Sequence, residues 1–385
     1  ECDVINKMLD DKIMPKFLVF DKGGRKEREK LVKNKEAPID FFQSIDFLRS
    51  KGFEIQHLSS SGNYKNNLVY FFGKILEELF CRISHIGIRP LSVYKFKKII
   101  NKSDYIVSLT DGFSLSLAFY YTFLETNKHI KLVGAFHKLS DYDNKLPKVF
   151  KKIYYKLFLK ILKRLDFMIF YGRADRLNSI KNFNIKKEKT FLIKFGVDTL
   201  FWEPNKKNNF YSNYIFSIGQ DPARDLDTLL KVKTKKKIHI HTSLLTFRNE
   251  NKFKITNGSY HKKKNSLSDL QVKKLYQDSF AVVVPLKDVF QPSGYSVTLQ
   301  AMACGKPVIL TKTKGLWAPE LFENFKNCIL VKPGEVEDIE NAIKFLENEK
   351  ETYKYISEQA RKTVEENFSL INANHSTLEI FKNFY

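Results

Sequence analysis

The chain has 385 residues, of which 43% are hydrophobic and 28% are charged, so it is long enough for two domains with full cores. Its formal net charge is +23, and most of its basic residues are lysine rather than arginine. Proteins that recognise a nucleic-acid sequence depend on arginine for contacts with bases and phosphates, so this composition argues against a nucleic-acid partner. It leaves open attraction to an anionic membrane surface or an ordinary solvated lysine surface.

Short apolar runs predict six strands in the first half of the chain, at residues 16–20, 53–58, 104–109, 130–135, 167–171 and 190–193. Longer runs between them predict helices at residues 40–50, 67–84, 114–127 and 149–165. Residues 105–124 carry one charge, Asp111, but Thr110 and Gly112 interrupt them, which favours a strand, a turn and a helix over a membrane span. Strands that alternate with helices predict a parallel, doubly wound α/β sheet.

The alternation restarts near residue 214. Strands are expected at residues 214–219, 237–242, 253–256, 281–286, 307–310 and 328–331, and helices at 224–233, 268–279, 297–303, 335–349, 351–368 and 370–385. A proline and a polar run mark a seam at residues 201–211. We therefore predict two Rossmann-like domains that face a cleft, residues 1–205 and 206–368, with residues 369–385 as a helix that crosses back to the first domain.

The four cysteines are scattered and form no metal-binding motif: Cys2, Cys81, Cys304 and Cys328. This pattern favours a reducing cytoplasm and argues against a zinc site or a disulfide framework. No secretion signal is apparent, and the chain begins at Glu1 rather than at a methionine, so we expect an upstream N-terminus.

Residues 291–311, QPSGYSVTLQAMACGKPVILT, predict a loop, a small-residue helix, a tight turn and a buried strand. A glycine-containing loop that enters a helix presents free backbone N–H groups at the positive end of the helix dipole. Such a unit can bind an anion. On the residues alone, ordinary strand–helix–strand packing is an equally good interpretation.

The order of these residues resembles the donor-binding core of GT-B glycosyltransferases, most closely family 4 (group 1). In that family, two Glu residues eight positions apart precede the pattern AMA-x-G-x-PV, which stands here as AMACGKPVI at residues 301–309. Gln300 occupies the second Glu position, and Pro292 occupies the first, beside Gln291. The resemblance implies the GT-B fold, an N-terminal acceptor-binding domain, a C-terminal domain that binds a nucleotide-sugar donor, and no metal or other cofactor.

A second segment supports the resemblance. Gly196, Val197 and Asp198, followed by Trp202 and Pro204, are similar to the family motif GVD-x-x-x-F-x-P, with Trp202 in the Phe position. We expect a structural role for this motif, with the glycine in a turn and the aspartate as a cap.

A third segment is SIGQD at residues 217–221, which is followed by Arg224 and is similar to the first strand–loop–helix unit of the family's C-terminal domain. Arg224 is the only cation in this loop, so we expect it to stabilise the donor diphosphate, whose charge a guanidinium fork matches. The alternative is a surface arginine at a helix start, paired with Asp221 or Asp225.

The resemblance also implies which residues bind the donor. Gln300 would contact the ribose hydroxyls, which an amide can do because it both donates and accepts hydrogen bonds. The contact with the donor sugar that the family's first Glu makes would fall to Gln291 or Asp288, and both remain open. The expected donor-binding residues are Gly23, Gly24, Gly219, Gln220, Arg224, Gln291, Ser293, Gly294, Tyr295, Ser296 and Gln300.

His137 follows the strand at residues 130–135, where family members often carry a histidine at the mouth of the cleft. The resemblance implies that it hydrogen-bonds the donor sugar or phosphate, and with Arg224 it completes the expected catalytic pair. A polar loop residue without a catalytic role is the alternative.

The helix expected at residues 149–165 is strongly basic. Its cations recur mostly at a spacing of three to four: Lys148, Lys152, Lys156, Lys160, Lys163 and Arg164. This pattern favours a helix whose lysine face lies in water, and the alternative is a face that docks on anionic lipid headgroups.

The expected function is the transfer of a sugar from a nucleotide-sugar to a hydroxyl of a glycan or lipid-linked acceptor in polysaccharide, lipopolysaccharide or glycolipid synthesis. The resemblance implies retention of the anomeric configuration, whereas the cysteine pattern and the basic surface lead us to expect a cytoplasmic enzyme, peripheral on the inner face of the membrane. Two alternatives remain: a GT-B module that binds sugar or lipid without catalysis, and a nucleotide-sugar epimerase.

Overall fold

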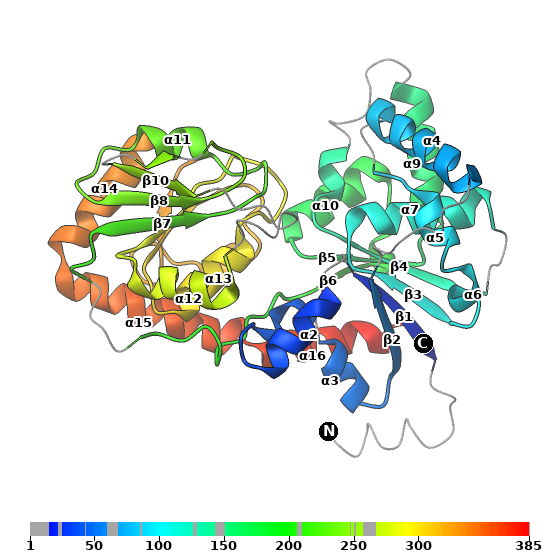
Figure 1. Cartoon of the computed structure of the whole chain (residues 1–385), viewed down its shortest axis with the longest axis horizontal. Helices are drawn as coiled ribbons and strands as arrows, with labels where there is room; N and C mark the ends of the chain where they lie inside the picture. The colour runs from blue at the N-terminus through cyan, green and yellow to red at the C-terminus, as the bar shows by residue number, and fades with distance from the viewer. Residues whose placement is uncertain are drawn as a thin grey trace.

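The computed structural model of the chain describes residues 15–21, 25–42, 44–59, 68–84, 87–125, 129–142, 151–205, 210–246, 248–249, 252–256 and 267–384. They form two lobes, each built around one sheet with helices on both faces (Figure 1). This arrangement confirms the prediction of two Rossmann-like α/β domains, whose boundaries in the sequence stay predictions.

The first sheet has six parallel strands in the order β2-β1-β3-β4-β5-β6. The strands are β1 Lys16–Asp21, β2 Glu54–Ser59, β3 Tyr105–Ser108, β4 Lys131–Phe136, β5 Phe167–Phe170 and β6 Thr190–Leu192. The helices of this lobe are α2 Arg25–Lys33, η1 Ile39–Phe42, α3 Ile45–Ser50, α4 Leu68–Ser84, α5 Pro90–Tyr94, α6 Lys97–Ile100, α7 Asp111–Phe123, η2 Leu139–Asp141, α9 Lys151–Lys163, α10 Arg173–Phe183 and η3 Lys187–Lys189.

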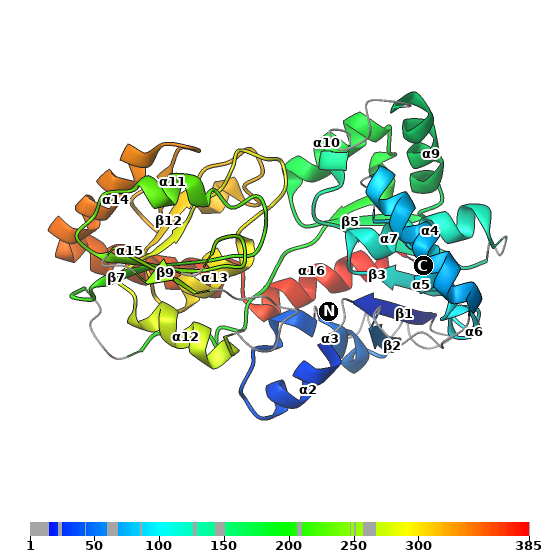
Figure 2. The ribbon, with the colours of Figure 1, turned by 45° about the horizontal axis from the view of Figure 1, so that its top comes forward.

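Alternate residues of β1 show how this sheet is covered on both faces. Leu18 and Phe20 pack in one apolar core with residues of α7 and α9, whereas Phe17 and Val19 pack in another with residues of α3 and of α16 Leu370–Lys382. Helix α16 therefore covers the first sheet, and Figure 2 shows it running from between the two lobes toward the strands of the N-terminal lobe.

The second sheet has seven strands in the order β13-β12-β11-β7-β8-β10-β9, and β9 alone runs antiparallel to its neighbour. The strands are β7 Tyr214–Ile218, β8 Lys237–His241, β9 Arg248–Asn249, β10 Phe253–Thr256, β11 Val282–Val284, β12 Val308–Thr311 and β13 Ile329–Val331. The helices of this lobe are α11 Leu226–Lys231, α12 Asp269–Asp278, α13 Tyr295–Ala303, η4 Pro319–Leu321, α14 Val336–Asn348 and α15 Lys350–Asn367.

Several local elements differ from the expected ones, and helices α2 and α10 form where no helix was expected. The helix expected at residues 40–50 is divided into η1 and α3, with Ser44 between them at a φ of 66°. Strand β9 has two residues, which are too few to show a repeating pattern of apolar residues in the sequence. Residues 105–124 form β3 and α7 as expected, and none of the helices described is long and apolar enough to cross a membrane.

Candidate active site

The loop after β7 lies at the carboxyl end of the second sheet, where open α/β sheets bind ligands. Gly219 N donates to His241 O at 3.2 Å, and Thr242 Oγ1 donates to Gly219 O at 2.7 Å. Gln220 Oε1 accepts hydrogen bonds from the backbone N–H, at 2.6 Å, and from the hydroxyl of Ser243. The loop is therefore fixed against the end of β8.

Arg224 extends under this loop, and only 6% of the residue is exposed. A Cβ atom at Gly219 would lie 2.2 Å from its Nε, and one at Gly294 would lie 3.4 Å from its Nη1. The guanidinium thus occupies space left by two glycines. Its Nε and Nη1 have no hydrogen-bond partner in the described part of the chain, and burial lowers its pKa although the charge of Asp221 opposes that change. A surface arginine in an ion pair, the alternative from the sequence, is therefore wrong.

The loop before α13 meets the loop after β7 at Asp221. Gln291 Nε2 donates to Asp221 Oδ2, and Ser293 Oγ donates to the same oxygen at 3.3 Å. Gly294 is the N-cap of α13 with a φ of 82°, and within the described part of the chain it provides no side-chain cap for the first N–H groups of the helix. The buried guanidinium and this helix start thus lie together, which makes the region suited to an anion.

The two candidates for the missing first Glu lie in different surroundings. Asp288 forms an ion pair with Lys314 Nζ at 2.8 Å, and this contact lowers its pKa. Gln291 is buried against Asp221. Only Gln291 is thus in direct contact with the loop after β7.

Gln300 lies on the side of α13 that meets the first lobe. Its Nε2 donates to Asp40 Oδ2 at 3.3 Å, and Trp202 Nε1 donates to the same oxygen at 2.8 Å. Asp198 N donates to the other oxygen of Asp40 at 2.5 Å. Burial raises the pKa of Asp40 to about 7, although these hydrogen bonds act in the opposite direction. The side-chain amide of Gln300, which we expect to contact the ribose, is therefore also part of a buried contact between the lobes.

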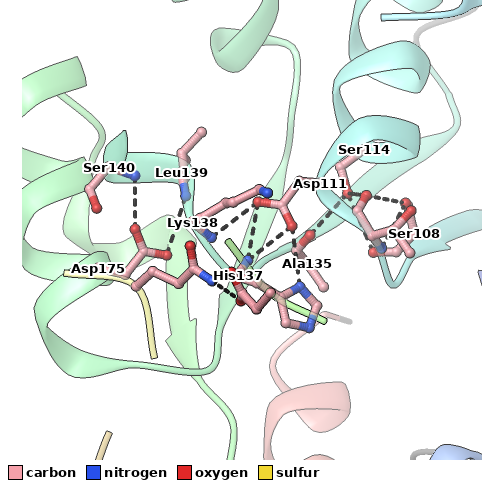
Figure 3. Close-up of polar contacts among 12 residues, drawn as sticks. Ser108, Asp111, Ser114, Ala135, His137, Lys138, Leu139, Ser140 and Asp175 are labelled. Atoms are coloured by element: carbon pink, nitrogen blue, oxygen red, sulfur yellow. Dashed lines mark hydrogen bonds and ion pairs between the residues drawn. The ribbon is translucent and has the colours of Figure 1, made fainter. Parts of the chain in front are cut away.

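His137 follows β4 at the carboxyl end of the first sheet and lies beside Asp111, the first residue of α7 (Figure 3). His137 Nδ1 is 3.2 Å from Asp111 Oδ2. Its ring stacks on Tyr171 with 4.3 Å between centroids and 18° between planes. The ring of Tyr171 is parallel to that of Tyr295 at 6.1 Å, so aromatic rings connect His137 to the start of α13.

The remaining predicted residues are placed as follows. Ser296 is half-buried in the first turn of α13, next to Tyr295, whose ring also contacts Phe195 and Trp317. Gly23 and Gly24 lie outside the described residues. The structure thus gathers Gly219, Gln220, Arg224, Gln291, Ser293 and Gly294 around two adjoining loops of the second lobe, with His137 joined to them through Tyr171 and Tyr295.

Sequence reasoning missed three acidic residues of this region. Asp221 was considered only as a surface partner of Arg224, although its place between Gln220 and Arg224 was a usable signal. Asp111 was considered only as the single charge within an apolar run. Asp40 gave no signal, because its partners Trp202 and Gln300 lie 162 and 260 residues away.

Comparisons with known proteins bear on the family and on the fold. Residues 259–363 match the family model described as "Glycosyl transferases group 1". An uncharacterized glycosyltransferase of Methanocaldococcus jannaschii is 32% identical over 111 residues, which is 29% of this chain. The similarity covers 27% of the length of that relative.

Solved structures resemble the whole chain. HepE of Anabaena in complex with UDP-glucose has a TM-score of 0.64 at 16% identity, covering 96% of this chain and 99% of that one. Sucrose-phosphate synthase of Thermosynechococcus elongatus has a TM-score of 0.66 at 12% identity, and the lipopolysaccharide outer core galactosyltransferase WaaB has a TM-score of 0.55 at 13% identity. Each of these two similarities covers 96% of this chain and 99% of the other protein's chain. The chain therefore has the GT-B fold, and its C-terminal half contains a region that matches the group 1 glycosyltransferase family model.

Proposed function

We propose that the protein transfers a sugar from a nucleotide-sugar donor to a hydroxyl acceptor. The observation that supports this proposal is the buried guanidinium of Arg224, whose Nε and Nη1 have no hydrogen-bond partner among the described residues and lie between Gly219 and Gly294. An unpaired buried cation is costly, and a diphosphate would satisfy it. The same cation would then stabilise the negative charge that develops on the departing nucleoside diphosphate.

The N-terminal lobe would supply the other side of the reaction. His137 is exposed at 28% of its side chain and is linked through Tyr171 to Tyr295 at the start of α13. A substrate between Arg224 and His137 would contact both lobes, which favours transfer inside a site from which water is excluded. We propose no role for a metal, because the guanidinium and the helix start would together meet the charge of the diphosphate.

The finer features of the proposal rest on the resemblance to family 4. They are retention of the anomeric configuration, and an acceptor from polysaccharide, lipopolysaccharide or glycolipid synthesis. WaaB, which shares the fold, is named for lipopolysaccharide. The proton NMR spectrum of the product, read at the anomeric position before mutarotation, would separate retention from inversion.

We also propose a cytoplasmic enzyme that docks on an anionic membrane through α9. Lys152, Lys156, Lys160 and Lys163 are exposed on this helix, and Ile153 among them is 65% exposed. Phe158 and other apolar residues of the opposite face are buried in the lobe. An exposed lysine row with an apolar residue between its members favours contact with lipid headgroups.

Nucleotide release from a panel of UDP-, GDP- and ADP-sugars, with and without membrane lipid, tests the proposed function. UDP-glucose is the first donor to test, because HepE was crystallised with it. We expect release above the rate without enzyme from at least one donor. Binding of nucleotide without any turnover would instead favour a non-catalytic module, which the two replaced Glu positions and the Gln300–Asp40 contact also suit. Absence of any nucleotide binding would contradict the proposed transfer from a nucleotide-sugar.

A further inference from the structure

Asp111 holds His137 through both its backbone and its ring. Asp111 Oδ2 is 3.2 Å from His137 Nδ1, and the two carboxylate oxygens accept the His137 N–H at 3.2 and 3.1 Å. Asp111 Oδ1 also accepts the Lys138 N–H at 3.1 Å, as Figure 3 shows. The imidazole is thus oriented by a buried carboxylate on a different element, the start of α7.

The charge state of Asp111 decides which ring nitrogen carries the proton. Burial by itself would raise the pKa of Asp111, but the hydrogen bond and charge of His137 and two backbone N–H groups bring it below its usual value. Asp111 is therefore ionised at neutral pH and can only accept hydrogen bonds. His137 must then donate from Nδ1, which leaves the lone pair of a neutral imidazole on Nε2.

The position of the ring aims this lone pair away from Asp111. Tyr171 covers one face of the imidazole, and the partly exposed side chain has no hydrogen-bond partner for Nε2 within the described residues. Tyr171 also lies against Tyr295 of the second lobe, so the free edge of the ring lies near the meeting of the two lobes.

We infer that Asp111 is a positioning residue that fixes His137 in the Nδ1–H form, so that Nε2 accepts a hydrogen bond from a hydroxyl of the bound substrate. This inference rests on the proposed function for the identity of the substrate. According to this inference, the N-terminal lobe provides a hydrogen-bond acceptor for a sugar hydroxyl and not an anion site formed by backbone N–H groups. The N–H groups of residues 137–140 support this, because carboxylates already occupy all of them.

Asp175 of α10 provides a matched control. Its carboxylate accepts the N–H groups of Leu139 at 3.3 Å and Ser140 at 2.8 Å, so it holds the same loop without touching the His137 ring. Burial raises the pKa of Asp175 to about 6, and the nearby charges of Asp111 and Asp141 act in the same direction. Asp175→Asn therefore perturbs the loop and its charge but leaves the Asp111–His137 contact in place.

The first arm of the test measures the tautomer and needs no turnover. In the full chain with ¹⁵N-labelled histidine, His137 is assigned by the signal lost in His137→Gln. We expect the Nδ1–H form in the wild type and in Asp175→Asn, and loss of that preference in Asp111→Asn. An Nε2–H form in the wild type, or an unchanged tautomer in Asp111→Asn, overturns the inference.

The second arm measures nucleotide release with the donor that the wild type accepts. Asp111→Asn should lower kcat about 10- to 100-fold, the cost of losing a hydrogen bond to a charged group. It should add little in a His137→Gln background, because the two residues act as one unit. Unchanged turnover in Asp111→Asn, or losses that add fully to those of His137→Gln, would overturn the inference. If the wild type releases nucleotide from no donor, the proposed function fails, and the tautomer arm still decides whether Asp111 orients His137.

Discussion

Gln300 and Asp40 are joined by a hydrogen bond between the two lobes, with 3.3 Å from Gln300 Nε2 to Asp40 Oδ2. Both side chains are buried. An amide at position 300 satisfies the carboxylate, whereas the Glu of the related family would place a second carboxylate beside it. This contact gives a physical reason for the replacement of Glu by Gln in a segment that otherwise keeps the pattern AMA-x-G-x-PV.

Gln300→Glu should lower the stability of the protein. Like charges at hydrogen-bond distance in a buried site cannot both ionise freely, so the free energy of unfolding should fall by about 1–3 kcal/mol at neutral pH. Urea unfolding of the wild type and the variant measures this difference. The double variant Asp40→Asn/Gln300→Glu serves as the control, because it removes the repulsion and should recover most of the loss. Losses that simply add in the double variant would contradict the explanation.

Asp40 should also make stability depend on pH. Burial raises its pKa in the folded protein to about 7, above the value of about 4 of an unfolded aspartate. The folded protein therefore binds this proton more tightly than the unfolded chain. The resulting stabilisation is complete below about pH 4 and is lost as the pH rises through about 7.

Melting temperatures of the wild type and Asp40→Asn, measured across this window, test that linkage. Asn cannot titrate, so the wild type should lose stability relative to Asp40→Asn as the pH rises. Other titrating groups are common to both proteins and cancel in the difference. Parallel curves would show that Asp40 does not take up a proton in this range.

The fold was predictable because apolar residues recur along its strands and helices in patterns typical of those elements. Runs such as Val282–Val284 and Val308–Thr311 are continuous apolar segments, as buried parallel strands require, and the turn at Gly305 has the positive φ of 67° that glycine favours. Strand β9 escaped prediction because two residues have no period.

The candidate site was only partly predictable, and the reason is distance along the chain. Arg224 and Gly294 could be selected from motifs, because each belongs to a local loop-and-helix pattern. Asp111 and Asp40 act through partners that are 26 to 260 residues away, and a single sequence gives no signal for such contacts. The burial of Arg224 was also unpredictable, since it depends on the space left by two glycines in separate loops.

Arg224→Ala should reduce turnover by roughly a hundredfold or more, as the loss of a donor to a developing negative charge does. Nucleotide release under saturating donor measures the effect. Lys287→Ala is the matched control, because Lys287 is an exposed cation whose Nζ donates to Pro222 O in the same loop. If both variants kept wild-type turnover and melting temperature, Arg224 would have no place in the site.

Gly219→Ala should reproduce much of this loss without changing any charge. The new Cβ would lie 2.2 Å from Arg224 Nε, so the guanidinium would have to move. Adding Gly219→Ala to Arg224→Ala should cause little further loss of turnover, because the clash needs the arginine. Gly87→Ala is the control, since its Cβ would meet nothing within 4 Å. Equal effects of Gly219→Ala with and without Arg224 would point to damage elsewhere in the loop.

The lysine face of α9 should bind anionic vesicles. Replacing Lys152 and Lys156 by Glu should weaken pelleting with such vesicles by at least about tenfold, since each cation near the surface contributes on the order of 1 kcal/mol. Raising the salt should weaken wild-type binding in the same direction, because exposed charges are screened. As a control, Lys344 of α14 and Lys354 of α15, which are both exposed, are replaced by Glu. This variant has the same charge change on the other lobe and should bind the vesicles nearly as well as the wild type. Indifference to lipid charge, or an equal loss in the control, would show that net charge rather than α9 governs any attraction.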